Sequence, residues 1–307
     1  MRREFTLTLV ALALLALTAC DKKPASVHDG KGYPILFGCT DTTRADVGAA
    51  TIEDLRDNGF RVYSFVDGVN DISFTKDVYW VENNKVWAYD NLEYWVPGCK
   101  YSFRAFYPNP KDNYTLNVDT SSVDLSYKID NFDITSQQDL MQASATANVA
   151  PGNVAPGGGS VVDLDFQHLL ANVTIKIKAE INVTIKDVTL KFVPVKGSYT
   201  NGIWSYTTQG NIEKTNLNKT LNSSNKEFQD VTDGGFLVFP NNVGDARLFI
   251  DTSNKSYDIK LPATPSAWIA GTKYTYTLTI KQNDILFDEP TVEEWDEENA
   301  TGSVVIK

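Results

Sequence analysis

Residues 173–178 read VTIKIK, with apolar and polar side chains in strict alternation. Successive side chains of a β-strand point to opposite faces, so this pattern predicts a strand with one buried face and one face in water. The same alternation recurs at Val183–Phe192, Ser256–Leu261 and Tyr274–Lys281. Antiparallel sheets commonly bury one face and expose the other, so the second half of the chain is expected to form an antiparallel β-sandwich.

The first half shows shorter strand patterns bounded by turn residues. Strands are predicted at Phe60–Val66, Tyr94–Pro97 and Tyr101–Tyr107, and Val78–Trp80 with Lys85–Tyr89 as a hairpin. Capping patterns predict two short helices, one within Ala45–Asn58 and one that opens at Ser136–Asp139 and ends near Ala143. The sequence therefore predicts an all-β fold with two sandwich domains and a few short helices.

Residues 150–160, APGNVAPGGGS, are the densest Pro/Gly run in the chain. Such a run predicts either a domain boundary or a long loop between strands. We place the two domains at 33–160 and 161–307, as the chain length suggests. The polar stretch Gln209–Lys226 is expected to be an exposed loop with a short strand.

The N-terminus has the pattern of an export signal. Arg2 and Arg3 precede the apolar stretch Leu7–Leu17, and small residues lead to Cys20. We predict a lipoprotein signal peptide at 1–19, lipidation of Cys20, and a flexible tether at 20–32. The alternative is an ordinary secretory peptide that is cut nearby.

The composition is acidic, with a formal net charge of −11 over 307 residues. This balance argues against nucleic acid as a partner, because phosphates require clusters of Lys and Arg. Besides Cys20, the chain has Cys39 and Cys99, which could pair in an oxidising compartment or remain thiols inside a core.

The stretch Tyr33–Asp46, YPILFGCTDTTRAD, joins a short strand pattern to a polar segment. Ile35, Phe37 and Cys39 share one face at period two, and Arg44 is the only basic residue of the stretch. It is either an ordinary first strand or a strand that a trypsin-like protease could release.

The sequence offers little for catalysis. It has two histidines, His28 and His168, and it lacks the short motifs of zinc, phosphate and serine-hydrolase sites. We expect no enzyme activity, no cofactor and no metal, and we expect His168 to be a structural residue.

Two other stretches could bind a ligand. One is an aromatic band that could stack on sugar rings or pack into the core: Tyr79, Trp80, Trp87, Tyr89, Tyr94 and Trp95. The other is Glu293–Glu298, which could hold Ca²⁺ or form a solvated acidic loop.

Motifs along nearly the whole chain resemble the fimbrillin superfamily, the FimA/Mfa1-type surface pilins of Bacteroidetes, and particularly its Mfa1-like branch. The matching pieces, in order, are Ile35–Phe37 with Thr43–Ala45, Val78–Trp80 with Trp87 and Tyr94–Gly98, Tyr101–Pro108, Asp139–Ala143, Asp165–Val173, Gly271–Tyr276, and Trp295 with Gly302.

The resemblance implies two tandem transthyretin-like β-sandwich domains and export as a lipoprotein to the outer membrane and cell surface. It implies cleavage by an arginine-specific protease between Arg44 and Ala45, which releases the strand Ile35, Leu36, Phe37 and Cys39. A C-terminal segment of another fimbrial subunit would then fill the groove, as in donor-strand complementation. Val304, Val305 and Ile306 are either that donor or the last strand of their own domain.

The leading hypothesis is a fimbrial structural subunit with a role in adhesion. Alternatives are a glycan-binding surface lipoprotein and a non-polymerising tip or anchor subunit. A Cys39–Cys99 disulfide would favour the tip or anchor, because it would keep the first strand attached after cleavage.

Overall fold

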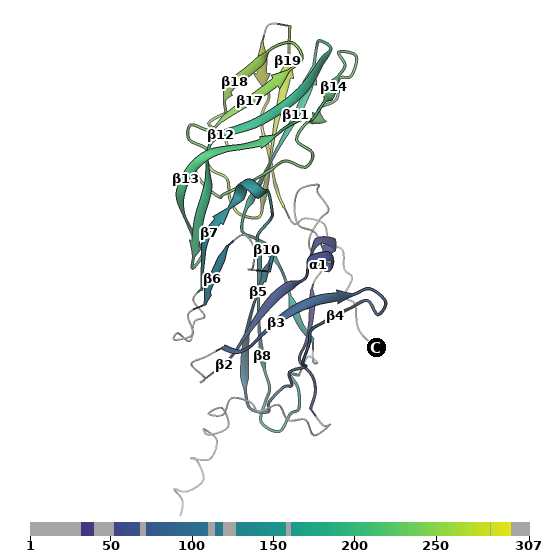
Figure 1. Ribbon diagram of the computed structural model, residues 1–307, viewed down its shortest axis with the longest axis vertical. Helices are drawn as coiled ribbons and strands as arrows, with labels where there is room; N and C mark the ends of the chain where they lie inside the picture. Colours follow the sequence, from purple (N-terminus) through teal and green to yellow (C-terminus); the bar gives the residue numbers. More distant parts are fainter. Residues whose placement is uncertain are drawn as a thin grey trace, which may run out of the picture.

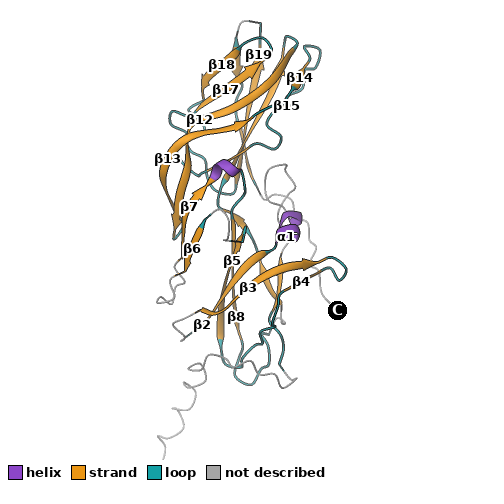
Figure 2. Ribbon diagram, in the orientation of Figure 1, coloured by secondary structure: helices purple, strands orange, loops and turns teal. Residues whose placement is uncertain are grey.

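The computed structural model describes residues 32–39, 52–67, 72–109, 114–118, 127–157, 161–282 and 284–295. In these ranges the helical segments are α1 (Ile52–Asn58) and the 3₁₀ turn η1 (Ile134–Ser136), and all other regular structure is β-strand (Figure 2). The all-β prediction is confirmed, and the strand Phe60–Val66 is observed with its predicted bounds. Within the described ranges, no helix has the length and apolar character needed to cross a membrane.

The molecule consists of two bodies stacked along its long axis (Figure 1). The first body is built on a six-stranded antiparallel sheet in the order β10-β8-β5-β2-β3-β4. Its strands are β10 (Gln167–His168), β8 (Met141–Asn148), β5 (Lys100–Tyr107), β2 (Phe60–Val66), β3 (Ile72–Val81) and β4 (Val86–Ala88). A separate parallel pair belongs to the same body: β1 (Leu36–Cys39) and β9 (Val161–Leu164).

The second body has two sheets. The seven-stranded sheet contains β18 (Ser256–Lys260), β17 (Arg247–Thr252), β12 (Val183–Thr200), β7 (Tyr127–Asp133), β6 (Thr115–Val118), β13 (Ile203–Lys214) and β14 (Lys219–Leu221). The six-stranded sheet contains β15 (Gln229–Asp230), β11 (Ala171–Ala179), β19 (Thr272–Ile280), β20 (Ile285–Phe287), β16 (Phe236–Val238) and β21 (Thr291–Glu294).

The expectation of purely antiparallel sheets is wrong, because β11 pairs with β19 in parallel. β11 is also buried on more than its apolar face, since Asn172 and Thr174 are almost fully enclosed. Parallel strands are commonly covered on both faces. Alternation of polar side chains along residues 173–178 therefore does not correspond to a fully solvated face.

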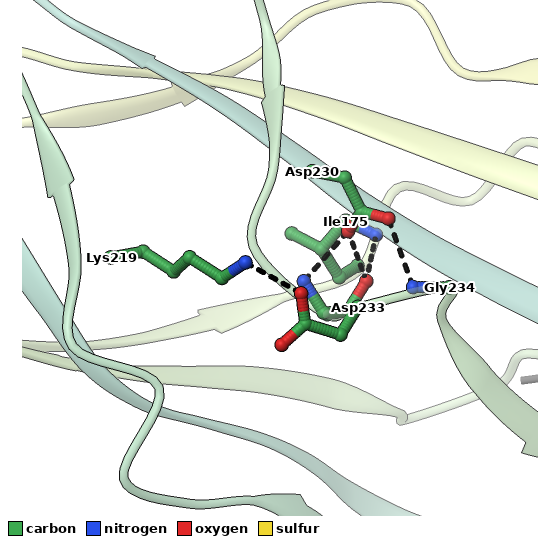
Figure 3. A network of polar contacts seen from close by, with 6 residues as sticks. Ile175, Lys219, Asp230, Asp233 and Gly234 are labelled. Carbon is green, nitrogen blue, oxygen red and sulfur yellow. Dashed lines mark hydrogen bonds and ion pairs between the residues drawn. The ribbon is translucent and has the colours of Figure 1, made fainter. Parts of the chain in front are cut away.

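A polar turn covers the polar face of β11 (Figure 3). The carboxylate of Asp230 accepts hydrogen bonds from the backbone N–H groups of Thr232 at 2.7 Å and Gly234 at 3.0 Å. The hydroxyl oxygen of Thr232 accepts one from the N–H of Ile175 at 3.2 Å. These contacts satisfy the buried polar groups where the chain passes from β15 to β16.

At the junction of the bodies, the first sheet contributes side chains to two hydrophobic cores. On β2, Phe60 and Val62 face the core of the first body, whereas Tyr63 and Phe65 face the core of the second. Tyr127 of β7 packs on Phe106 with ring centroids 4.9 Å apart, and its hydroxyl donates to the amide oxygen of Gln142. Strands of the two bodies therefore pack directly against each other at the junction.

Strand pairing does not change at residue 160. Strands β9 and β10, within residues 161–168, still pair within the first body, and the earlier strands β6 and β7 belong to a sheet of the second body. The described part of the Pro/Gly run, 150–157, connects β8 to β9, so it lies between strands of one body. A Pro/Gly run marks a loop, but it does not show which strands pair on either side of it. Strand pairing depends on contacts between residues that are distant in the sequence.

The predicted helix that opens at Ser136 is wrong. Gln137 has a left-handed backbone, with φ of 53°, and its side-chain amide pairs with both the N–H and the carbonyl of Leu237 at 2.9 and 3.1 Å. The chain then continues into β8 at Met141. Tertiary hydrogen bonds to β16 thus override the local capping pattern.

Two other predictions need correction. Tyr94–Pro97 is not a strand, and only an isolated bridge joins Tyr94 to Pro34. Gln209–Lys226 is not mainly a loop, because β13 extends to Lys214 and β14 follows. By contrast, the hairpin of β3 and β4 is confirmed, with its turn at residues 82–85.

His168 is a structural residue, as predicted. Its Nδ1 lies 2.6 Å from a carboxylate oxygen of Asp139, and its ring stacks on Trp295 with centroids 4.0 Å apart and an interplanar angle of 8°. All three side chains are buried. Trp295 directly follows β21 of the second body, and His168 lies in β10 of the first. Their stacking therefore connects the C-terminal end of the second body to the first body.

Replacing Trp295 by alanine should destabilise this junction strongly. Removal of a buried tryptophan costs about 3–5 kcal/mol, and the His168 ring would also lose its cover. Urea unfolding followed by circular dichroism would measure the loss. Val292→Ala is the matched control, because Val292 is exposed in the adjacent strand and should change stability by less than about 0.5 kcal/mol. Equal effects of the two substitutions would contradict the proposed fastening.

Candidate functional site: the seat of the first strand

The first strand, β1, lies between β9 on one edge and residues 93–95 on the other. We call this position in the first body the seat of the first strand. On one edge, β1 pairs in parallel with β9, with Phe37 opposite Val162 and Cys39 opposite Leu164. Val162 and Leu164 are both buried. The inward faces of the two strands therefore meet the same core.

On its other edge, the chain entering β1 bonds to the segment 93–95. The N–H of Ile35 donates to the carbonyl of Glu93 at 2.8 Å, and the N–H of Trp95 donates to the carbonyl of Tyr33 at 3.0 Å. The seat therefore satisfies backbone groups on both sides of a very short strand, as burial of a strand requires.

Tyr89 connects the strand to the wall of its seat. Its hydroxyl donates to the carbonyl of Ile35 at 2.6 Å and accepts from the N–H of Glu93 at 3.2 Å. Burial raises the pKa of Tyr89 to about 12. The hydroxyl is protonated at neutral pH, as tyrosine ordinarily is, and the raised pKa extends its donor role to more alkaline pH.

Ile35 and Phe37 fill the floor of the seat. They are 0% and 2% exposed, and the Phe37 ring lies 5.5 Å from Tyr89 and 5.7 Å from Phe103. Leu36, which points the other way, is half-buried. This alternation agrees with the predicted inward face, and Cys39 also packs against the same core.

The remaining residues of the predicted processing scheme lie outside the described residues: Cys20, Arg44, Ala45, Val304, Val305 and Ile306. The two other cysteines are resolved. Cys39 is half-buried, and Cys99 is buried. Side-chain burial and backbone hydrogen bonds hold the first strand in its seat.

The aromatic band does not form an exposed platform. Trp87, Tyr89 and Trp95 are buried, Trp80 and Tyr94 are half-buried, and Tyr79 alone of the six is exposed. Trp95 packs edge-on against Tyr101 at 4.9 Å. The band is therefore part of the core around the seat, and the hypothesis of a sugar platform on it is wrong.

The acidic stretch gives no support to a calcium site. Glu293 and Glu294 are exposed in β21, and residues 296–298 lie outside the described ranges. No group of three or more His, Cys, Asp or Glu side chains in the described part of the chain could hold a metal ion.

Sequence reasoning missed how the seat is built. Val161–Phe166 resembles a strand, but its parallel pairing with β1 leaves no local signal. Tyr89 was part of the aromatic pattern, but nothing in its neighbourhood indicates a hydrogen bond to Ile35. The alternation at Ile35 and Phe37 was the one available signal.

The sequence model of the fimbrillin-like family matches residues 43–295. No curated protein matches the chain. Among solved structures, a fimbrial protein from Bacteroides vulgatus is similar with a TM-score of 0.64 at 18% identity, over 85% of this chain and 99% of that one. A proposed cell adhesion protein from Bacteroides uniformis gives a TM-score of 0.54 at 18% identity, over 85% and 98%.

A third structure, a proposed cell adhesion protein from Bacteroides ovatus, gives a TM-score of 0.52 at 15% identity, over 88% of this chain and 99% of that one. At these identities the likeness concerns the fold. The family match, however, extends over most of the chain and over both bodies. Together with the fold, it shows that this chain belongs to the fimbrillin-like family.

Proposed function

We propose that the protein is a structural subunit of a bacterial surface fimbria, exported as a lipoprotein and assembled by strand exchange. In this proposal, cleavage after Arg44 releases the first strand, and a strand of another subunit takes its seat. The observation that carries the proposal is the short first strand, which completes a hydrophobic core by side-chain burial and by backbone pairing on both edges. Membership of a fimbrial family supports association with other subunits at the cell surface.

The physical basis of the exchange is the cost of an empty seat. Burial of Ile35 and Phe37 contributes roughly 1.5–3 kcal/mol for each side chain. Removal of the strand would also leave backbone groups of β9, Glu93 and Trp95 without partners. An incoming strand with apolar residues at alternate positions recovers both contributions.

The C-terminal residues supply such a pattern. Val304 and Ile306 are apolar residues two positions apart, as are Ile35 and Phe37. Their side chains would therefore point to the same face of a strand. We propose Val304, Val305 and Ile306 as the donor that fills the seat of a neighbouring subunit.

The order of sites along the chain links assembly to release from the membrane. Cys20 and the first strand both precede Arg44. A single cut after Arg44 would therefore separate the folded bodies from the lipid and free the first strand to leave. A disulfide between Cys39 and Cys99 would keep the strand attached after the cut, so the polymerising role requires that these two cysteines stay unbonded.

Brief digestion with an arginine-specific protease should yield one dominant new N-terminus, Ala45. Arg56, Arg61 and Arg104 lie in α1, β2 and β5, where hydrogen-bonded backbone resists cleavage. N-terminal sequencing would identify the cut, and electron microscopy would show whether the product polymerises.

Arg44→Ala is the matched variant and should abolish both the cut and polymerisation. Initial cleavage at Arg56, Arg61 or Arg104 with Arg44 intact would rule out strand release. A clean cut at Arg44 that yields only monomers would instead favour the tip or anchor alternative.

Tyr89→Phe should loosen the first strand without touching the cleavage site. Loss of the hydroxyl leaves the Ile35 carbonyl and the Glu93 N–H without that partner, at a cost of about 1–3 kcal/mol. After cleavage, the N-terminal fragment should dissociate about tenfold faster or more in size-exclusion or fluorescence measurements.

Tyr79→Phe is the control for this experiment. Its hydroxyl also donates to a nearby acceptor, Asp90, but on an exposed tyrosine. Removal of a hydrogen bond at the surface should leave the release rate almost unchanged. Release rates that change equally in both variants would show that Tyr89 does not secure the strand.

Lipidation is tested by Cys20→Ala, which should move the protein from membrane to soluble fractions. More than one acyl chain is needed for stable anchoring, and each buried CH₂ contributes about 0.8 kcal/mol. Fractionation and metabolic labelling with a palmitate analogue would report the change. An unlabelled wild-type protein, or an unchanged membrane fraction for the variant, would contradict the prediction.

A further inference from the structure

The second body carries an open hollow of about 700 Å³. One side is formed by Tyr206–Gln209 of β13 together with Pro194 of β12. The other side is formed by 240–242, which follows β16, and by 267–269, which precedes β19. Four segments of the second body thus meet around one space.

The hollow has a neutral lining. None of its lining residues is charged, although the chain contains 28 Lys and Arg and 39 Asp and Glu. A site for an anion or a cation would be expected to present a charged partner. The chemistry therefore favours an uncharged ligand.

Polar groups in the lining have unused hydrogen-bonding capacity. The side-chain oxygen of Asn241 is buried and has no hydrogen-bond partner among the residues that the structure describes. A buried acceptor left in this way costs about 1–3 kcal/mol, so a ligand hydroxyl that donates to it would be favourable. Gln209 and Asn242 add exposed side-chain amides, each able to donate and to accept.

Apolar surface lies beside these amides. Tyr206 and Ile269 are 37% and 62% exposed. The Tyr206 hydroxyl donates to the carbonyl of Pro240, and its ring packs on Phe239 with centroids 5.5 Å apart. The ring is thereby fixed in position without a ligand.

The backbone around the hollow is irregular on one side and held firmly on the other. The ladder between β12 and β13 has three register shifts, and Phe192 has a φ of 58° within β12. Such bulges redirect side chains and are common beside functional sites. Opposite these bulges, the backbone N–H of Trp268 donates a hydrogen bond to the backbone carbonyl of Asn241 at 2.8 Å. This bond fixes the two loops against each other.

We propose that this hollow is a binding site for a neutral saccharide. Sugar hydroxyls both donate and accept, which matches a lining of amides and hydroxyls, and the C–H faces of a sugar ring pack on tyrosine and aliphatic surface. The site is independent of strand exchange, because it lies in the other body. It gives the fimbrial subunit a glycan-recognition surface that the aromatic band does not provide.

The test is saturation-transfer NMR on the intact chain with maltotriose, mannotriose and N-acetyllactosamine as neutral probes. At least one of them should bind at millimolar concentration or below. Sialyllactose serves as the charged probe, and a peptide of residues 302–307 serves as the protein probe. The proposal would be overturned if no neutral sugar bound, whether no probe bound at all or only the charged sugar or only the peptide did.

Variants locate the binding. Gln209→Ala and Asn241→Ala should each weaken the sugar's affinity about tenfold, the loss of roughly one hydrogen bond to a ligand. Gln209 is exposed, so its variant tests the site even if Asn241→Ala fails to fold. Tyr79→Ala is the control, since this exposed tyrosine lies in the first body and should leave affinity unchanged. Loss of affinity in Tyr79→Ala, or unchanged affinity in Gln209→Ala, would place the sugar elsewhere and overturn the assignment.

Discussion

The core of the first body is closed by a short strand that side-chain burial and a few hydrogen bonds hold in place. Ile35 and Phe37 are enclosed by β9 on one side and by the stretch from Tyr89 to Trp95 on the other. Without these two side chains, the aromatic residues around Phe103 would face an open trench. The fold therefore depends on an occupant for this seat, and the physics requires an apolar strand there without specifying which chain supplies it.

The position of β9 makes the seat a property of the whole chain. β9 follows β8 through the Pro/Gly run and precedes β10, which carries His168. His168 in turn stacks on Trp295, the last residue of the described structure. The wall of the seat therefore adjoins the junction between the bodies. The junction in turn adjoins the C-terminal end of the second body.

The contacts at the junction also explain why the two bodies are not independent domains. Tyr63 and Phe65 of the first sheet share a core with residues of the second body, and Gln137 pairs with the backbone of Leu237. A packed apolar interface of this kind restricts relative motion of domains. In a fimbrial subunit, such stiffness would transmit orientation from one strand seat to the next, while the hollow beside β13 remains accessible at the surface.

The sequence by itself determined the elements whose cause is local. Alternation specified β2, β5 and the hairpin of β3 and β4, and it also identified the inward face of Ile35 and Phe37. It did not determine the partners. The parallel pairs β1–β9 and β11–β19, the place of β6 and β7 in the second body and the role of Gln137 were decided only in the tertiary structure. The physical reason is that alternation records which side of a strand is buried, whereas pairing depends on backbone groups that are the same in every residue.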